Sequence, residues 1–237
     1  MQSEAIKILI KNQKGGVGKS LIAFWLAAGI AQQRNEKVLI LTSDSQDNIP
    51  VFAGRTKEAK KITTGLETWI EKGQGGILEL RKNLYYIPLK SVAITQDNGL
   101  KFKNFIEAIS TKVNYIIIDA SPVLSLDDLF IEISDEIIIP TYLDEVTTTG
   151  ISNLITKVGV KKIKAIIPNR SHNTQIEKVF YNKLFSALEN TNIILTKPIK
   201  QSAGISKLIN VGKTIWETKQ KTFNPIREEI QKVIEVI

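Results

Sequence analysis

Apolar residues gather in short runs that are separated by longer stretches with helical spacing. The apolar runs lie at residues 5–11, 37–43, 114–120, 135–140 and 163–168, with a weaker one at 192–197. Most of these runs are apolar almost throughout, which is typical of strands buried on both faces of a parallel sheet. We therefore expect an α/β fold built on a mostly parallel, twisted sheet.

Segments with helical periodicity fill the gaps between the expected strands. They cover residues 21–33, 65–72, 100–110, 147–157, 174–189 and 203–210. A last segment opens with Pro225 and places Ile226, Ile230 and Val233 at helical spacing, with mixed charges opposite. The alternation predicts helices on both faces of the sheet. The last helix is expected to pack against that sheet, because it lacks the basic polar face and aromatic residues of a membrane-surface helix.

The chain is long enough for one substantial core and shows no internal boundary. It has 237 residues, 43% of them hydrophobic, and no linker or repeat, so we expect a single domain over residues 1–237. Because cysteine is absent, disulfides, Fe–S clusters and thiol catalysis are excluded. The longest apolar run has 11 residues, whereas a membrane span needs about 20. With no signal-peptide pattern, the expected location is the cytoplasm.

The stretch KNQKGGVGKS, residues 11–20, lies between an expected strand and an expected helix. Its Gly-Lys-Ser ending in this setting is typical of a P-loop, whose backbone N–H groups and helix N-terminus bind phosphate. Lys19 would pair with β- and γ-phosphate oxygens, and Ser20 would bind Mg²⁺. A glycine-rich turn before a buried helix is the less favoured alternative. The expected nucleotide contacts are Gly15, Gly16, Val17, Gly18, Lys19, Ser20 and Leu21.

Two aspartates that follow expected strands complete a candidate nucleotide site. Asp119 ends the apolar strand YIIID, where a Walker B carboxylate orients Mg²⁺, often through water. Asp44 follows the strand VLILT and could orient or deprotonate an attacking water. Taken alone, an aspartate in such a loop is more often a turn residue.

Positive charge is concentrated in the last third of the chain. The net charge is +8 in total. Residues 1–150 hold 17 basic and 18 acidic residues, whereas residues 151–237 hold 15 basic and 6 acidic residues. A basic surface on one part of a domain is the electrostatic footprint of a polyanion such as nucleic acid. A lysine-rich face that only favours solubility is the alternative.

The loop NQKGGVGKS resembles the deviant Walker A loop of the ParA/MinD family of P-loop ATPases, and its leading Asn-Gln favours the ParA branch. Further stretches resemble the family in order: VLILTSDSQDN, YIIIDASPVLS, DEIIIPTYLDEVTTTG and GKTIWE. Thr42 and Ser45 replace the first aspartate and the proline of the family's D-x-D-P-Q segment, whereas Asp44 retains the second aspartate. An early first strand resembles the short ParA type, which has no N-terminal DNA-binding domain.

The resemblance implies roles for individual residues. In this family ATP and Mg²⁺ bring two subunits face to face, and a lysine before the first glycine reaches the partner's phosphates. Lys14 would have that role here, and Lys14, Lys19 and Asp44 would be the catalytic residues. Ser20 and Asp119 would hold the metal. The family's adenine contacts follow the later strands, and they correspond to Asn169 and Pro198.

The resemblance also implies a function. A ParA-like partition ATPase forms an ATP-dependent sandwich homodimer on double-stranded DNA, and a ParB-like adaptor stimulates hydrolysis. Repeated cycles would segregate plasmid or chromosomal DNA from a nucleoid-associated location, without a membrane partner. The charge asymmetry and the family's use of basic residues select Arg170, Lys200, Lys207 and Lys213 as DNA contacts. The alternative is a ParA/MinD-like ATPase that positions a protein cargo or the cell-division machinery.

Overall fold

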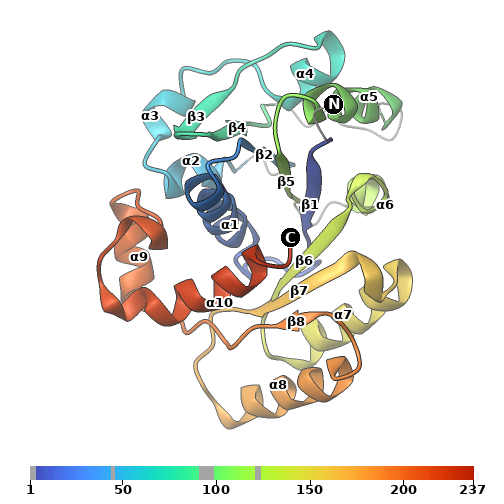
Figure 1. Ribbon diagram of the computed structural model, residues 1–237, viewed down its shortest axis with the longest axis vertical. Coiled ribbons are helices and arrows are strands. Elements are labelled where there is room, and N and C mark those ends of the chain that lie inside the picture. The colour runs from blue at the N-terminus through green and yellow to red at the C-terminus, as the bar shows by residue number, and fades with distance from the viewer. Residues whose placement is uncertain (1–3, 44–45, 91–98, 121–123) are drawn as a thin grey trace.

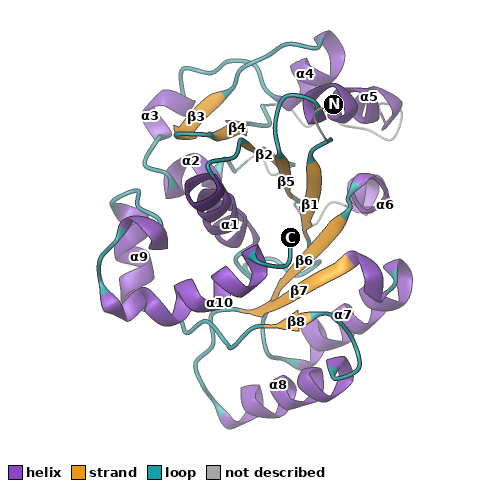
Figure 2. Cartoon of the chain, viewed as in Figure 1, coloured by secondary structure: helices purple, strands orange, loops and turns teal. Residues whose placement is uncertain are grey.

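The computed structural model describes residues 4–43, 46–90, 99–120 and 124–237. Within these ranges the centre is an eight-stranded sheet in the order β3-β4-β2-β5-β1-β6-β7-β8 (Figure 1, Figure 2). Neighbouring strands are parallel except β3, which runs antiparallel to β4. The strands are β1 (Ile6–Ile10), β2 (Val38–Thr42), β3 (Leu78–Arg81), β4 (Leu84–Ile87), β5 (Tyr115–Asp119), β6 (Glu136–Thr141), β7 (Ile163–Pro168) and β8 (Ile194–Leu195).

Helices cover both faces of this sheet (Figure 1). One face carries α1 (Lys19–Arg34), α2 (Asn48–Phe52), α3 (Thr56–Ala59), α9 (Ala203–Asn210) and α10 (Asn224–Ile234). The other carries α4 (Leu66–Lys72), α5 (Gly99–Ser110), α6 (Leu124–Ile133), α7 (Glu145–Val158) and α8 (Gln175–Leu188). Short 3₁₀ helices lie at Val160–Lys162, Ile215–Glu217 and Lys221–Phe223.

The central strands are buried on both sides, which confirms the expected mostly parallel sheet between two helical layers. Ile8 and Ile10 of β1 belong to the core under α1 and α10, whereas Leu9 belongs to the core on the opposite face. All three side chains are 0% exposed. Because neither face of these strands meets water, the apolar runs are continuous and do not alternate.

Several short elements are not predicted by the hydrophobic pattern. β3 and β4 form an edge hairpin across Lys82 and Asn83, and Asn83 has a positive φ of 63°. The pattern also leaves out α2, α3 and α6, and β8 is two residues long where a run of six was expected. Except for α6, which has ten residues, these elements have two to five residues, too few for a periodicity that stands out from loops.

The last helix packs on α1, as its apolar stripe predicts. Ile230 is fully buried in the same core cluster as the apolar residues of α1. The close approach depends on Gly29, where a Cβ would lie 2.5 Å from Ile234 and 2.9 Å from the Trp216 ring. Trp216 Nε1 donates a hydrogen bond of 2.7 Å to the Trp25 carbonyl. No helix in the described part of the chain is long and apolar enough to cross a membrane.

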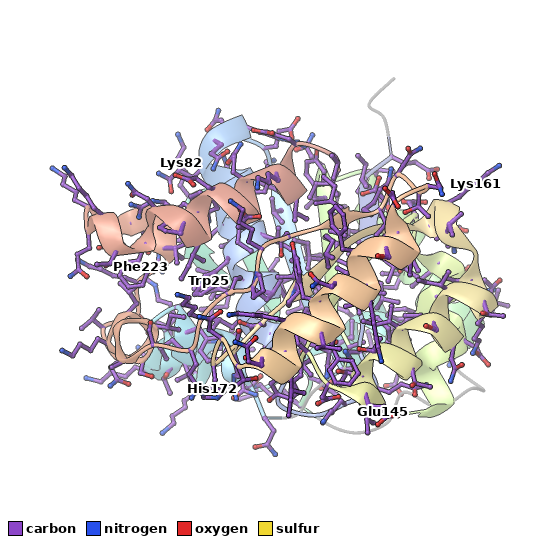
Figure 3. The ribbon with its side chains drawn as sticks, turned by 90° about the horizontal axis from the view of Figure 1, so that it is seen from below. Trp25, Lys82, Glu145, Lys161, His172 and Phe223 are labelled. Carbon is purple, nitrogen blue, oxygen red and sulfur yellow. The ribbon has the colours of Figure 1, made fainter. Side chains whose placement is uncertain are left out.

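Helix α9 and the start of α10 lie at one end of the molecule, well separated from the C-terminal end of α7. Figure 3 shows Phe223 with α9 and the start of α10 at one end of this view, and Lys161 near the C-terminal end of α7 at the other. Lys207, on α9, and Lys161 therefore lie toward opposite ends of the molecule in this view.

Candidate nucleotide-binding site

The glycine-rich loop follows β1 at the centre of the sheet, where β1 lies between β5 and β6. Ile10 ends β1 in register with Asp119, the last residue of β5. The loop leads directly into α1, which begins at Lys19 and has no acidic residue in its first turn. Loop and carboxylate thus share the edge of a parallel sheet at which ligands of such folds bind, beside a helix N-terminus that favours an anion.

Two loop glycines and two residues from neighbouring strand ends determine the loop's shape. Gly16 and Gly18 have φ values of 76° and 92°, which side chains rarely adopt. A Cβ on Gly18 would lie 2.3 Å from Asn169 Nδ2, and one on Gly16 would lie 3.1 Å from the Tyr142 hydroxyl. Tyr142 donates a hydrogen bond of 2.7 Å to the Gly16 carbonyl, and Asn169 donates one of 2.8 Å to the Val17 carbonyl.

Asn12 holds the start of the loop. Its Nδ2 donates to the Pro140 carbonyl and its Oδ1 accepts from the Lys14 amide, both at 2.8 Å. The sequence pattern assigns no role to Asn12 or Tyr142. The signal that could have identified them is a polar side chain directly after a buried apolar strand.

Lys19 lies at the opening of the loop and is only 8% exposed. Its ammonium group donates to the Lys14 carbonyl at 3.2 Å. Beside this cation, the donor-rich backbone of residues 15–20 and the helix N-terminus fit the phosphates of a nucleotide. Leu21, the last predicted contact, is 9% exposed and belongs to the core cluster of α1.

Lys14 is directed away from its own loop, toward the N-terminus of α7. Its Nζ lies 2.8 Å from Asp144 Oδ2, and the two side chains are 40% and 37% exposed. The same ammonium lies 5.2 Å from the centre of the Tyr142 ring, a distance suited to a cation–π contact. Asp144 also caps α7 by accepting from the Thr147 amide at 2.8 Å. Burial opposes ionisation of Asp144, but the hydrogen bonds from Lys14 and Thr147 outweigh it and lower the carboxyl pKa.

Asp119 is 2% exposed and lies between the ends of β1 and β2. Its carbonyl accepts from the Ser43 amide at 3.2 Å and from the Thr42 hydroxyl at 3.4 Å. Among the described residues no group of three or more His, Cys, Asp or Glu could hold a metal ion. Mg²⁺ at this edge would take oxygen ligands from Ser20, phosphate and water, with Asp119 acting through water.

Asp44 and Ser45 lie outside the described residues, so the position predicted for the water-activating carboxylate stays a prediction. Asp47, which the sequence pattern did not single out, follows these two residues and is held by two hydrogen bonds. Asp47 accepts hydrogen bonds of 2.8 Å from the Tyr86 hydroxyl and from the Lys90 ammonium. The hydroxyl of Tyr86 and the cation of Lys90 thus fix the chain just after the predicted residue.

A cavity of about 710 Å³ lies between the segments after β7 and β8 and the start of α10. Pro198 lines it, together with the side chains of Phe223 and Ile226. Its size is within the range of about 300–1,000 Å³ that is usual for small-molecule sites. Asn169 does not line this cavity: it is 5% exposed and contacts the phosphate loop.

The four basic residues predicted to contact DNA are exposed but come from different segments. Arg170 is the second residue after β7 and has a positive φ of 55°. Lys200 lines the 710 Å³ cavity, Lys207 lies on α9, and Lys213 follows that helix. The structure therefore distributes them along the segments after β7 and β8 and along α9.

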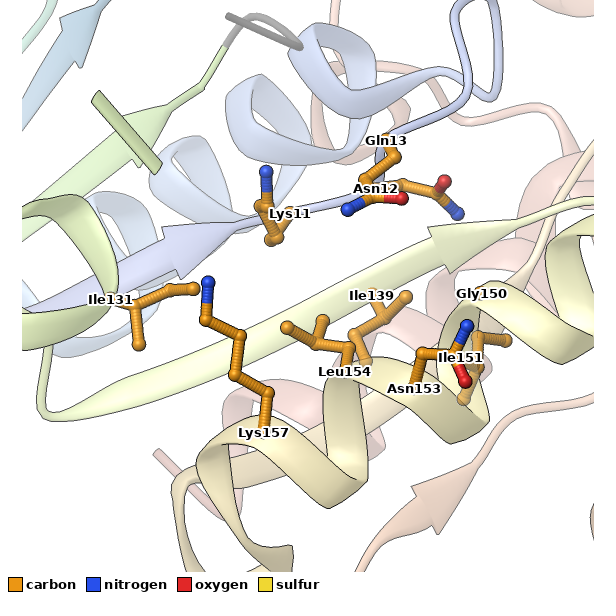
Figure 4. Close-up of a pocket in the computed structure, with 10 residues that line it drawn as sticks. All are labelled: Lys11, Asn12, Gln13, Ile131, Ile139, Gly150, Ile151, Asn153, Leu154 and Lys157. Carbon is orange, nitrogen blue, oxygen red and sulfur yellow. The ribbon is translucent and has the colours of Figure 1, made fainter. Parts of the chain in front are cut away.

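A smaller cavity of about 110 Å³ lies on the face of the sheet that α7 covers (Figure 4). Lys11, Asn12 and Gln13 line it from the loop, and Leu154 and Lys157 line it from α7. This volume is below the usual range for small-molecule sites, about 300–1,000 Å³. The residues that fit a nucleotide are thus those at the strand edge and not those around this cavity.

These features define the class of the protein as a P-loop nucleotide-binding fold. Its parts are a central parallel strand, a glycine-rich loop ending in Gly-Lys-Ser, the helix that follows, and an aspartate on the adjacent strand. The sequence profile of the AAA domain family matches residues 5–178, more than half of the chain. The chain belongs to this family, and it shares its fold with solved proteins of the ParA/MinD type.

Solved structures with this fold include three that align over almost the whole chain. Apo McdA from Cyanothece has a TM-score of 0.79 at 18% identity, covering 98% of this chain and 99% of its own. A plasmid partition protein from Borrelia burgdorferi B31 bound to AMPPNP has a TM-score of 0.78 at 20% identity, with the same coverage. MinD from Aquifex aeolicus has a TM-score of 0.74 at 16% identity, covering 98% and 95%. At these identities the likeness establishes the fold.

Among sequence relatives, an uncharacterised protein of Pseudomonas putida is 29% identical over 167 residues. The match covers 66% of this chain and spans 62% of the length of that relative.

Proposed function

We propose that this chain is a partition ATPase of the ParA type that works as an ATP-dependent homodimer on DNA. ATP and Mg²⁺ would bind at the strand edge that carries Lys19, Ser20 and Asp119. Two copies would face each other across their nucleotides, and hydrolysis would separate them. The observation that carries the proposal is the position of Lys14, whose ammonium lies 2.8 Å from Asp144 and not at its own phosphate loop.

The chemistry of the proposed site follows from charge. The buried Lys19 would offset the negative charge of the β- and γ-phosphates, and the amides of the loop would bind their oxygens. Ser20 would supply a metal ligand and Asp119 a carboxylate that orients metal-bound water. Asp44 is the proposed group that positions or deprotonates the attacking water.

Lys14 would complete the site of the second copy. Lys19 already supplies a cation to its own loop, so Lys14 is redundant there. The Lys14 side chain is 40% exposed and forms an ion pair with one carboxylate, that of Asp144. A triphosphate presented by a facing copy carries more negative charge than that carboxylate, so exchange of partners would link dimer formation to ATP. Loss of the γ-phosphate would weaken the attraction and release the copies.

The adenine would lie near the cavity of about 710 Å³ that Pro198 lines. Asn169 would contribute by holding the loop through its hydrogen bond to Val17. Apolar rings and side chains such as Phe223 suit a planar base, whereas the polar loop suits its phosphates.

The basic last third of the chain would supply the DNA contacts, with Arg170, Lys200, Lys207 and Lys213 on phosphates and not on base edges. Contacts of this kind bind duplexes without sequence preference. A ParB-like adaptor bound to the cargo would stimulate hydrolysis and detach the dimer, and the proposed site of action is the nucleoid in the cytoplasm.

The test combines sedimentation velocity with duplex binding, using ATP, a non-hydrolysable ATP analogue and ADP. The proposal expects a dimer and DNA binding with ATP or the analogue, and a monomer without DNA affinity with ADP. Equal behaviour with ATP and ADP would refute the ATP-dependent switch. An ATP-dependent dimer that binds no DNA would favour the alternative, an ATPase that positions a protein cargo.

A further inference from the structure

Two basic segments that are far apart in the sequence meet on one side of the molecule. Residues 55–61, RTKEAKK, hold four basic residues and one acidic residue, and residues 207–213, KLINVGK, hold two lysines. The first segment contains α3 and the second ends α9, and Figure 1 shows both helices on the same side of the fold. The charge asymmetry of the sequence draws attention only to the second segment.

Gly54, which precedes the first segment, and Gly212, in the second, approach each other backbone to backbone. A Cβ on Gly212 would lie 2.5 Å from Gly54 Cα, and one on Gly54 would lie 3.0 Å from Gly212 Cα. Both glycines have positive φ values, 66° at Gly54 and 63° at Gly212. No other residue type fits this contact without displacing one segment from the other.

Arg81, at the end of β3, also links the two segments where Gly54 meets Gly212, a contact that we call the junction. Its guanidinium donates to the Ala53 carbonyl at 3.0 Å, to the Gly212 carbonyl at 2.6 Å and to Glu217 Oε1 at 2.6 Å. Burial works against ionisation of Glu217, but hydrogen bonds from Arg81 and from the Thr214 amide outweigh it and lower its pKa. This acid is therefore held as a carboxylate inside the junction, with its charge directed at Arg81.

The lysines around the junction face solvent. Lys57, Lys60, Lys61, Lys207 and Lys213 are all exposed. Among the described residues none of the five forms an ion pair. Arg55 differs, because it pairs with Glu58 at 3.0 Å. Lys57 lies on α3, and Lys60 and Lys61 follow its last residue in a turn whose amides donate to the carbonyls of Thr56 and Glu58 at 3.2 and 3.1 Å.

We propose that Lys57, Lys60, Lys61, Lys207 and Lys213 form one preorganised surface, the α3–α9 surface, that binds the phosphate backbone of double-stranded DNA. This inference rests on the proposed function and extends its DNA contacts into the first half of the chain. Duplex DNA carries one negative charge per about 1.7 Å of its axis, so a rigid group of cations can meet several phosphates at once.

A nucleic acid fits this surface better than an anionic membrane. Interfacial binding depends on Trp, Phe or Leu side chains that enter the lipid beside the basic residues. The exposed large apolar residues here are valines, Val51 at 45% and Val211 at 65%. The fixed junction also suits a stiff polymer with regularly spaced phosphates more than a fluid sheet of lipids.

The experiment compares two variants with the same change of charge. Lys57→Gln, Lys60→Gln and Lys61→Gln are combined in one variant. Lys101→Gln, Lys112→Gln and Lys161→Gln are combined in the control, because these lysines are also exposed and form no ion pair among the described residues. Affinity for two unrelated duplexes is measured over a salt series with a non-hydrolysable ATP analogue. ATP turnover without DNA reports whether each variant folds.

The α3 variant should lose about tenfold or more in affinity at low salt, and its salt slope should fall by about 0.9 for each lysine that contacts a phosphate. Both duplexes should be affected alike, and the control variant should change by less than about twofold. ATP turnover without DNA should be the same in all three proteins.

The opposite results overturn either the α3–α9 surface or DNA binding itself. If wild type binds DNA and the α3 variant binds equally well, the surface is wrong and the proposed function stands. Equal losses in both variants would mean that net charge alone matters, which also refutes the surface. If wild type binds phosphatidylglycerol vesicles but neither duplex, the partner is a membrane, and DNA binding fails in both proposals.

Discussion

Asn169, at the end of β7, lies so close to Gly18 that a Cβ on the glycine would come within 2.3 Å of the asparagine amide nitrogen. The same nitrogen donates a hydrogen bond of 2.8 Å to the Val17 carbonyl, across 152 positions of sequence. The shape of the phosphate loop is therefore a property of two strand ends together and not of the loop sequence alone.

Gly18→Ala should weaken ATP binding severely. The φ of 92° is unfavourable for alanine by about 1–2 kcal/mol, and the methyl group would also displace Asn169. We expect a loss of more than about tenfold in affinity by calorimetric titration. Asn169→Ala removes one buried hydrogen bond that holds the loop. We expect it to weaken ATP binding by about 1 kcal/mol, which is about fivefold in affinity. Unchanged ATP affinity in Gly18→Ala would show that the loop does not need its left-handed residue.

Lys19→Ala and Lys14→Ala should separate two roles. Lys19→Ala should abolish detectable ATP binding, because the loop loses its buried cation. Lys14→Ala should leave the ATP affinity of the monomer near that of wild type, yet weaken the dimer and slow hydrolysis. Titration measures the first effect, and sedimentation with a non-hydrolysable analogue measures the second. A Lys14→Ala protein with an intact dimer and full turnover would make Lys14 an ordinary surface lysine.

Asp144 should make a small contribution to stability that depends on pH. Its pKa is lowered in the folded state, so its contribution is complete above the unfolded-state pKa of about 3.9 and is lost as pH falls through the folded-state value. With the side chain 37% exposed, the effect should be less than about 1 kcal/mol. Urea unfolding of wild type and Asp144→Asn should differ at pH 7 and converge toward pH 2. A difference that stays constant across this range would exclude the titration of Asp144 as its cause.

Asp44→Ala should keep ATP binding and dimer formation but hydrolyse ATP about 10²–10⁴-fold more slowly, the usual contribution of a general base. Single-turnover hydrolysis is the measurement. Asp47→Ala provides the comparison, because Asp47 holds the same loop through Tyr86 and Lys90 and should affect the rate less. Wild-type turnover in Asp44→Ala would transfer the catalytic role to another group.

Arg81→Ala should lower the free energy of unfolding by about 2–3 kcal/mol, because it removes charged hydrogen bonds in a partly buried junction. Arg81→Lys should recover little of this loss, since lysine cannot reach two carbonyls and a carboxylate at once. Arg55→Ala is the matched control: its ion pair with Glu58 is 43% and 44% exposed, and such pairs contribute less than about 1 kcal/mol. Equal losses for Arg81→Ala and Arg55→Ala in urea unfolding would contradict a special role for the junction.

The central strands could be predicted from sequence, because burial on both faces makes their residues apolar almost without interruption, as in β2 and β5. The edge hairpin β3–β4 could not, since Glu79 and Lys82 are exposed and interrupt the apolar pattern over only four residues on each side. The phosphate loop was predictable because Gly-Lys-Ser follows a strand and opens a helix. Its chemistry is local, so a local pattern suffices.

The partners of the residues that support the loop were not predictable, because these partners lie far away along the chain. Tyr142 meets Gly16 across 126 positions and Asn12 meets Pro140 across 128. Nothing in either stretch alone indicates its partner, because the pairing is created by the strand order. The junction of Gly54 with Gly212 has the same origin: two ordinary turn glycines become a contact only when the sheet brings them together.

The dependence of the phosphate loop on Pro140, Tyr142 and Asn169 limits what evolution or an engineer can do with it. Residues 11–20 are not a transferable module, because a graft into another sheet would carry the glycines and the lysine but leave behind the groups that bend the backbone around phosphate. The shortest segment that carries this site with its supports extends at least from β1 to the residue after β7. Recombination within that segment would keep residues 11–20 but separate the loop from the residues that hold its backbone in place.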